Sequence, residues 1–139
     1  MSGETHVVRL TKTDIMELKK VIDSVVTVAA HGIFYRTGIA IGQRISTSSR
    51  GSDYFHDVAE ILKKEGWIKE IKFSEDGTVI AKGSIEIEPS NIESCHILRG
   101  IISAIYQKHL NTKNVFCTEY KCESLGNPHC EFKIESEVI

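Results

Sequence analysis

The sequence lacks the features that direct a protein to a membrane or out of the cell. It has no run approaching the roughly 20 apolar residues that span a bilayer, and no apolar stretch follows a basic segment near the N-terminus. We therefore expect a cytoplasmic protein without a signal peptide or a membrane-spanning helix.

An excess of basic residues is also missing, because 17 Lys and Arg residues stand against 19 Asp and Glu residues. The formal charge of −2 gives no positive surface for nucleic acid, so we expect no direct contact with it. If the protein regulates a gene, a separately encoded regulator must contact the DNA. A phosphate-binding loop is absent too: Gly38 and Gly42 are four residues apart, but no Lys-Ser or Lys-Thr pair follows them.

The length predicts one domain over residues 1–139. With 41% hydrophobic residues, such a chain can bury roughly two-thirds of its unfolded surface in one core. A domain of this size does not need disulfides, and thiols stay reduced in the cytoplasm. The four cysteines are therefore free for another role.

Apolar periodicity predicts helical structure in the first half of the chain. Spacings of three and four predict a helical segment over residues 11–45, with a break near Gly32 left open, and an amphipathic helix over residues 52–65. Small residues, among them Gly38 and Gly42, gather in the second half of the first segment. Close packing of another backbone is the commoner reason for this pattern, and the wall of a ligand pocket is the alternative.

The second half changes to a period of two. Alternation predicts a β-hairpin over residues 67–88, with Ser84 and Glu86 on its solvent face. A helix over residues 91–110 and a second hairpin over residues 114–135 follow. We predict an α+β domain: an antiparallel four-stranded sheet of two hairpins with helices packed on one face.

All four cysteines fall in the last third of the chain. Cys95 lies early in the last predicted helix, Cys117 and Cys122 lie on the third strand or at its end, and Cys130 starts the fourth strand. Converging thiolates in a reducing compartment are used to bind a soft metal, most often zinc. The spacing leaves the fourth ligand open, because Cys117 and Glu119 point to the same face of a strand.

The same region resembles the C-terminal signature of the 4-vinyl-reductase (hydrocarbon-binding) domain family. The matching residues are Glu93-Ser-Cys95, Glu119-x2-Cys122 and Gly126-Asn-Pro-His-Cys130. The region is also similar to the sensory domains of phenol- and toluene-responsive transcription activators, which carry zinc. The resemblance implies a zinc site formed by Cys95, Glu119, Cys122 and Cys130, with Cys117 as the alternative to Glu119.

A metal site with four protein ligands is closed, which favours a structural zinc over metal-assisted hydrolysis. The family name suggests reduction of a vinyl group, but nothing in the sequence resembles a nicotinamide or flavin site. We therefore expect a sensor or regulatory domain that binds a small hydrophobic or aromatic molecule and changes conformation. An enzyme is the less favoured interpretation. The alternatives are an interaction scaffold related to vesicle-tethering subunits and an accessory protein or reductase of tetrapyrrole vinyl-group metabolism.

The ligand is expected in an apolar pocket between the small-residue helix and the sheet. The candidate contact residues are His31, Tyr35, Gly38, Trp67, Arg99, Tyr106 and Cys117. Each of them also fits a plain structural role, such as a core ring or a solvated charge.

The segment from Ile15 to Val28 carries more apolar residues than one helix face needs. Excess apolar area on a cytoplasmic domain usually marks a contact surface, which predicts a homodimer formed through the N-terminal helices. The alternative is that these residues pack under the sheet.

Overall fold

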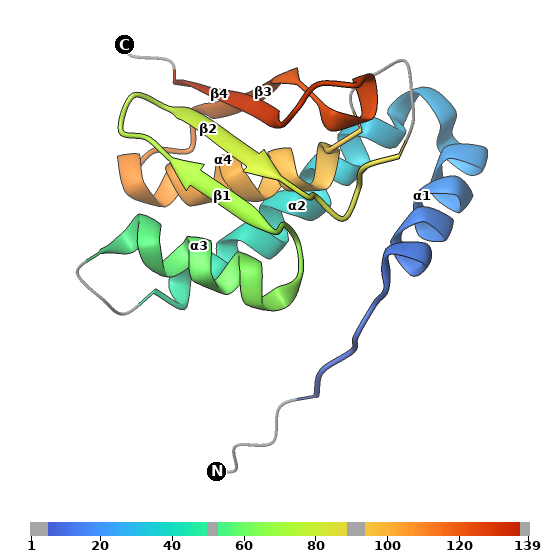
Figure 1. The fold of residues 1–139 in the computed structure, drawn as a ribbon, viewed down its shortest axis with the longest axis horizontal. Coiled ribbons are helices and arrows are strands. Elements are labelled where there is room, and N and C mark those ends of the chain that lie inside the picture. Colours follow the sequence, from blue (N-terminus) through green and yellow to red (C-terminus); the bar gives the residue numbers. More distant parts are fainter. Residues whose placement is uncertain (1–5, 50–52, 89–93, 137–139) are drawn as a thin grey trace.

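The computed structural model describes residues 6–49, 53–88 and 94–136 of the chain (Figure 1). Over these residues the helices are α1 (Lys12–Val26), α2 (Ala30–Thr47), α3 (Tyr54–Glu65) and α4 (His96–Leu110). The strands are β1 (Glu70–Phe73), β2 (Thr78–Lys82), β3 (Val115–Lys121) and β4 (Cys130–Ser136). Two short 3-10 helices, η1 (Thr27–Ala29) and η2 (Glu123–Leu125), complete the described part.

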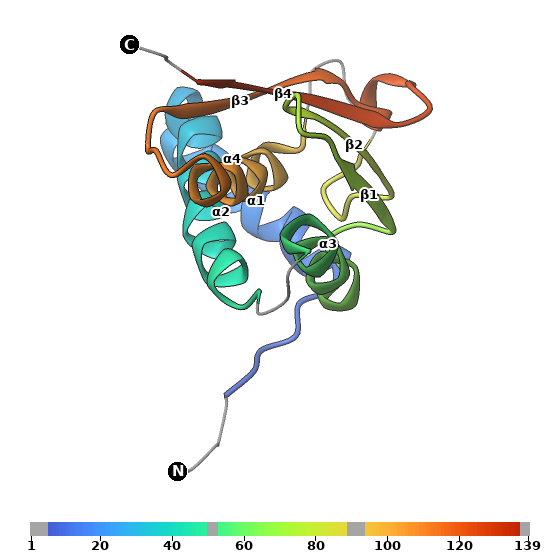
Figure 2. The same ribbon diagram turned by 90° about the vertical axis from the view of Figure 1, so that its left-hand side faces the viewer.

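The four strands form one antiparallel sheet in the order β1-β2-β4-β3. β2 pairs with β4, with Val79 opposite Phe132, and this pairing joins the two hairpins. α3 and α4 lie on one face of the sheet, and α4 packs directly against both β3 and α2 (Figures 1 and 2). The predicted α+β fold class is confirmed. Among the described residues, none of the helices combines the length and the apolar character that a membrane span requires.

The helical pattern over residues 11–45 is interrupted. α1 begins with a capping box between Thr11 and Asp14, but it ends at Val26 and gives way to η1. Thr27 there has a φ of 45°, which a helix cannot accommodate. The β-branched run Val25 to Val28 explains the interruption, because such residues lose side-chain freedom in a helix. The first of the two helices therefore extends separately from the second (Figure 1).

The second strand also ends earlier than predicted, at Lys82 and not at Glu88. Gly83 has a φ of 71°, and this left-handed conformation takes the chain out of the sheet. Ser84 and Glu86, predicted to face solvent, are buried as a result. The predicted first residues of the next helix, 91–93, lie outside the described residues, and the described helix begins at His96.

Glu86 replaces the missing side-chain cap of α4. Its carboxylate accepts hydrogen bonds from the backbone N–H of Ile97 at 3.0 Å and of Leu98 at 2.8 Å. The Lys19 ammonium on α1 also donates to this carboxylate, at 3.1 Å, and to the Ser94 carbonyl, at 2.7 Å. Burial raises the pKa of Glu86, while Lys19 and the two N–H groups oppose that rise. The negative charge at a helix N-terminus thus fastens α1 to the start of α4.

The small residues of α2 serve close helix packing. A Cβ atom on Gly38 would lie 2.0 Å from the Ile97 carbonyl oxygen, and one on Gly42 would lie 2.6 Å from the Ile101 carbonyl oxygen. Gly100 of α4 approaches α2 in the same way, because its Cβ would lie 2.0 Å from the Tyr35 carbonyl oxygen. The commoner of the two interpretations of this pattern is therefore what the structure shows.

Candidate metal centre

Four side chains with metal-binding atoms converge where the start of α4 meets β3 and β4. They are Cys95, Glu119, Cys122 and Cys130, whose ligand atoms all lie within 4.8 Å of one another, and all four residues are buried. Cys95 is the N-cap of α4, Glu119 lies on β3, Cys122 precedes η2 and Cys130 begins β4. The structure thus brings together the set that the family resemblance implied.

A β-bulge puts two of these residues on the same side of the sheet. Glu119 and Cys122 are three residues apart, so regular alternation would turn them to opposite faces. The register between β3 and β4 shifts between Glu119, which is opposite Phe132, and Lys121, which is opposite Glu131. Tyr120 is the extra residue and is exposed. The bulge therefore returns Cys122 to the inner face.

The cysteines are free thiols held by hydrogen bonds. The Sγ atoms of Cys95 and Cys130 are 3.8 Å apart, too far for a disulfide bond. The Cys95 thiol donates to the Ser84 hydroxyl oxygen at 3.4 Å, and the backbone N–H of Glu123 donates to Cys130 Sγ at 3.4 Å. Contacts of this kind orient metal ligands.

One buried oxygen of the cluster has no partner. Glu119 Oε1 accepts from the Cys95 backbone N–H at 3.3 Å, whereas Glu119 Oε2 has no hydrogen-bond partner within the described residues. A buried carboxylate oxygen left in this way is costly unless something else satisfies it. A metal ion at the centre of the cluster would do so.

The electrostatics fit the same conclusion. Burial raises the pKa of the Glu119 carboxyl, and the neighbouring Cys122 raises it further. The thiols of Cys130 and Cys95 donate hydrogen bonds that lower the pKa of Cys122. Negative charge is therefore concentrated on Cys122, while the other donors keep their protons until a cation compensates their charge. Three sulfurs and one carboxylate in a closed, buried set suit a tetrahedral site such as that of zinc.

Cys117 lies outside this cluster, on the edge strand of the sheet. Its backbone N–H donates to the Tyr35 hydroxyl at 3.3 Å, and its carbonyl accepts from Arg99 Nη1 at 3.1 Å. The Arg99 guanidinium also lies 4.2 Å from the centre of the Tyr35 ring. Three predicted ligand residues thus come together, but they bond directly to one another and seal the edge of β3.

The other predicted ligand residues are scattered. The His31 ring stacks on His96 at 4.0 Å, and Trp67 Nε1 donates to Glu65 at 3.1 Å. Gly38 is at the contact with α4, which fills the space where we predicted a pocket between α2 and the sheet. That pocket is therefore wrong in its predicted place.

Tyr106 lies in an aromatic group of its own, at the far end of α4. Its ring is 5.2 Å from Phe55, 6.1 Å from Phe73 and 6.2 Å from His109, measured between ring centres. Its hydroxyl donates to the Ser74 carbonyl at 2.6 Å. We refer to Phe55, Phe73, Tyr106 and His109 as the aromatic group. The sequence analysis missed three of its four members, because their spacing along the chain gives no hint that they meet.

Comparison with known proteins gives a family and a fold. Residues 87–136 match the family model of the 4-vinyl-reductase domain, which confirms the resemblance identified in the sequence. A comparison with curated proteins finds no match.

Three solved structures share the architecture. The phenol-responsive sensory domain of the transcription activator PoxR, solved with phenol, has a TM-score of 0.77 at 16% identity, over 96% of this chain and 78% of that one. A vinyl-4-reductase family protein from Methanocaldococcus jannaschii has a TM-score of 0.67 at 12% identity, over 98% of this chain and 85% of that one. A trafficking protein particle complex subunit 3 from Naegleria fowleri, covalently bound to palmitic acid, has a TM-score of 0.51 at 20% identity, over 92% of this chain and 98% of that one. Likeness at these identities establishes the fold.

Proposed function

We propose that the protein is a zinc-containing sensor or regulatory domain that binds a small hydrophobic or aromatic molecule and responds by changing conformation. The buried cluster of Cys95, Glu119, Cys122 and Cys130 carries this proposal, because it is a closed metal site in a fold shared with a phenol-responsive sensory domain. A closed site offers no open position to a substrate. The metal would therefore stabilise the fold.

The zinc would fasten the second hairpin to the start of α4. Cys122 and Cys130 lie at the two ends of the connection between β3 and β4, and Cys95 caps the helix. Glu86 and Lys19 already hold the same helix start from the other side. This end of the domain would be the fixed part against which a ligand-responsive part moves.

The aromatic group is the best candidate for the ligand contact. It joins α3, β1 and α4, and Phe55 and Phe73 are only half-buried. Aromatic rings in offset or tilted arrangements favour another ring beside them. A ligand here can shift the conformation only through its different affinity for two states, so the elements carrying these rings are the ones expected to move.

Thermal unfolding in the presence of phenol tests the proposal. At ten times its dissociation constant, a ligand of the folded state adds about 1.4 kcal/mol to the free energy of unfolding. For a domain of this size, we expect the unfolding temperature to rise by roughly 4 °C. Phe55→Leu should reduce this rise, and Phe116→Leu on the opposite edge strand should not.

The result that contradicts the proposal is equally plain. If phenol, toluene and larger apolar molecules all leave the unfolding temperature of the zinc-loaded protein unchanged, the domain is no sensor of such ligands. Steady conversion of any of them by the purified protein would show an enzyme.

We further propose that the chain forms a homodimer through α1. One side of this helix packs inward through Ile15 and is fastened by Lys19. The other side exposes Leu18, Val21 and Val25, which keep 49%, 59% and 75% of their surface accessible. A second copy of the chain would cover this apolar stripe.

Light scattering at micromolar concentration tests the dimer. We expect twice the chain mass of 15.6 kDa for the natural sequence and the single mass for Val21→Glu. Lys20→Glu introduces the same charge on the polar side of α1 and should stay dimeric. A monomeric natural sequence would show that α1 does not join two copies.

An interaction scaffold is the second candidate, because the fold also resembles a tethering-complex subunit that carries palmitic acid. In this chain the free cysteine outside the metal cluster is Cys117, which is fully buried, and burial raises the pKa of its thiol. A buried neutral thiol is a poor nucleophile, which disfavours acylation at this position.

A further inference from the structure

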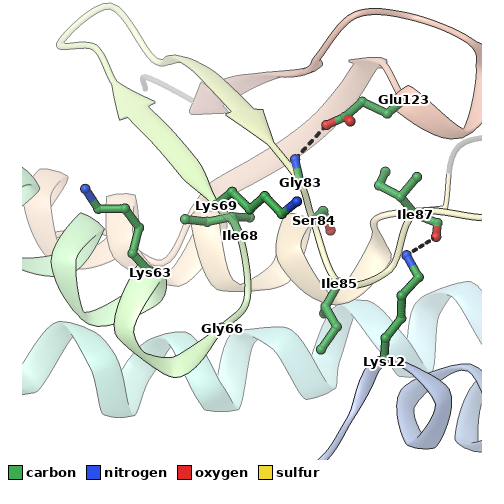
Figure 3. A pocket seen from close by; sticks show the side chains of 10 residues that line it. All are labelled: Lys12, Lys63, Gly66, Ile68, Lys69, Gly83, Ser84, Ile85, Ile87 and Glu123. Carbon is green, nitrogen blue, oxygen red and sulfur yellow. Dashed lines mark hydrogen bonds between the residues drawn. The ribbon is translucent and has the colours of Figure 1, made fainter.

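An open pocket of about 630 Å³ lies beside the metal centre, between the end of α3, the start of β1 and the segment that follows β2 (Figure 3). Its size falls within the range of small-molecule sites. Apolar side chains of Ile68, Ile85 and Ile87 and the lysines Lys12, Lys63 and Lys69 line it. It contains no member of the aromatic group and none of the ligand residues predicted from the sequence.

The pocket is positively charged in a chain whose formal charge is −2. Three lysines line it against one carboxylate, that of Glu123, which accepts a hydrogen bond from the Gly83 backbone N–H at 2.9 Å. An anion would therefore enter a locally favourable potential.

The three ammonium groups are not equally available. Lys63 pairs with Glu60 at 2.6 Å, and Lys12 donates to the Ile87 carbonyl. Lys69 has no carboxylate partner within the described residues, and its ammonium group reaches toward Ser84. In Figure 3, the Lys69 and Lys12 ammonium groups lie on either side of Ser84 and Ile85.

The apolar part of the pocket is held in place by the backbone. The N–H of Ile85 donates to the Trp67 carbonyl at 2.9 Å, and the N–H of Ile87 donates to the Ser84 carbonyl at 3.2 Å. Ile85 and Ile87 remain only partly buried although they lie in this anchored segment. A preformed apolar surface of this kind lowers the cost of binding.

Two further wall residues connect the pocket to the metal ligands. The Ser84 hydroxyl accepts from the Cys95 thiol, and the Glu123 backbone N–H donates to Cys130 Sγ. The wall is therefore part of the most constrained region of the domain.

We propose that this pocket binds a medium-chain carboxylate, with the head group on Lys69 and Lys12 and the alkyl chain along Ile85 and Ile87. Two neighbouring ammonium groups on flexible stems suit a singly charged head group. The partly exposed isoleucines suit an alkyl chain. The site is separate from the aromatic group, so it stands or falls independently of the response to phenol.

Titration calorimetry of the full chain, loaded with zinc, tests the site with octanoate below its micelle concentration. Octan-1-ol lacks the charge and acetate lacks the chain, so both should bind at least about tenfold more weakly, which corresponds to 1.4 kcal/mol. Lys69→Met keeps the stem and removes the charge, and we expect it to weaken octanoate binding about three- to tenfold. Lys64→Met, on the same helix end as Lys63 but outside the pocket, should bind as the natural sequence does.

Equal affinity for octanoate and octan-1-ol would overturn the proposal, because the lysines would then contribute nothing. Equal affinity of Lys69→Met and the natural sequence for octanoate would overturn it too. Each variant is also to be heated with phenol. A protein that binds octanoate as described but ignores phenol keeps this site and loses the sensor proposal, and the opposite pattern does the reverse.

Discussion

Cys122→Ser should lose the zinc and a large part of the stability of the domain. Cys122 is the donor on which negative charge concentrates, and its thiol is hydrogen-bonded by two other ligands. Structural zinc contributes on the order of 10 kcal/mol to the folding of small zinc modules. This chain has a core of its own, so we expect a smaller loss of about 3–5 kcal/mol, which lowers the unfolding temperature by roughly 10 °C or more.

The chain offers a matched control for that experiment. Cys117→Ser makes the same chemical change five residues earlier, in a thiol that is buried but outside the cluster. Elemental analysis should find one zinc per chain in Cys117→Ser and well under one in Cys122→Ser. Glu119→Ala and Cys117→Ala then decide the fourth ligand. Zinc kept by Glu119→Ala and lost by Cys117→Ala would assign that role to Cys117.

Gly38→Ala should destabilise the fold although it adds only one methyl group. That methyl carbon would lie 2.0 Å from the carbonyl oxygen of Ile97, which is backbone and cannot rotate away. The two helices would have to separate along a contact that Gly42 and Gly100 also need. Overpacking of a core usually costs about 1–3 kcal/mol, and we expect about 3 kcal/mol here because backbone meets backbone. Denaturant unfolding measures the loss.

Gly32→Ala is the control for this prediction. Gly32 lies in the same helix, but an added Cβ atom there meets nothing within 4 Å. Alanine is favoured over glycine inside a helix by about 0.8–1 kcal/mol, so this variant should be more stable than the natural sequence. If Gly38→Ala were as stable as Gly32→Ala, α2 would not be held against α4 as described. Space at that position would again support the pocket predicted from the sequence.

The difference between these two glycines shows why the ligand site could not be predicted. Gly32 and Gly38 have the same propensity, and only the position of α4 distinguishes them. Tyr35, Arg99 and Cys117 were chosen as pocket residues for their chemistry, and they do meet. They meet at a sheet edge, where they satisfy one another's polar groups and leave no space for a ligand.

Local patterns determined most of the secondary structure. Alternation placed Cys130, Phe132 and Ile134 on the inner face of β4, and helix-ending residues placed the ends of α3 and α4 at Gly66 and Asn111. These signals are local, because a strand alternates and a helix ends through the residues themselves. The Glu-x2-Cys-x7-Cys spacing likewise specified the set that now forms the buried cluster.

Long-range contacts decided the rest. The alternation of residues 83–88 predicts a strand, but the left-handed Gly83 and the demand of α4 for a cap turn Glu86 inward. Cys122 faces the cluster only because β3 bulges against β4. The pocket beside the metal centre and the aromatic group each join elements distant in sequence. A sequence records which side chains can bind a metal, a ring or an anion, whereas packing decides which of them are left with space and without a partner.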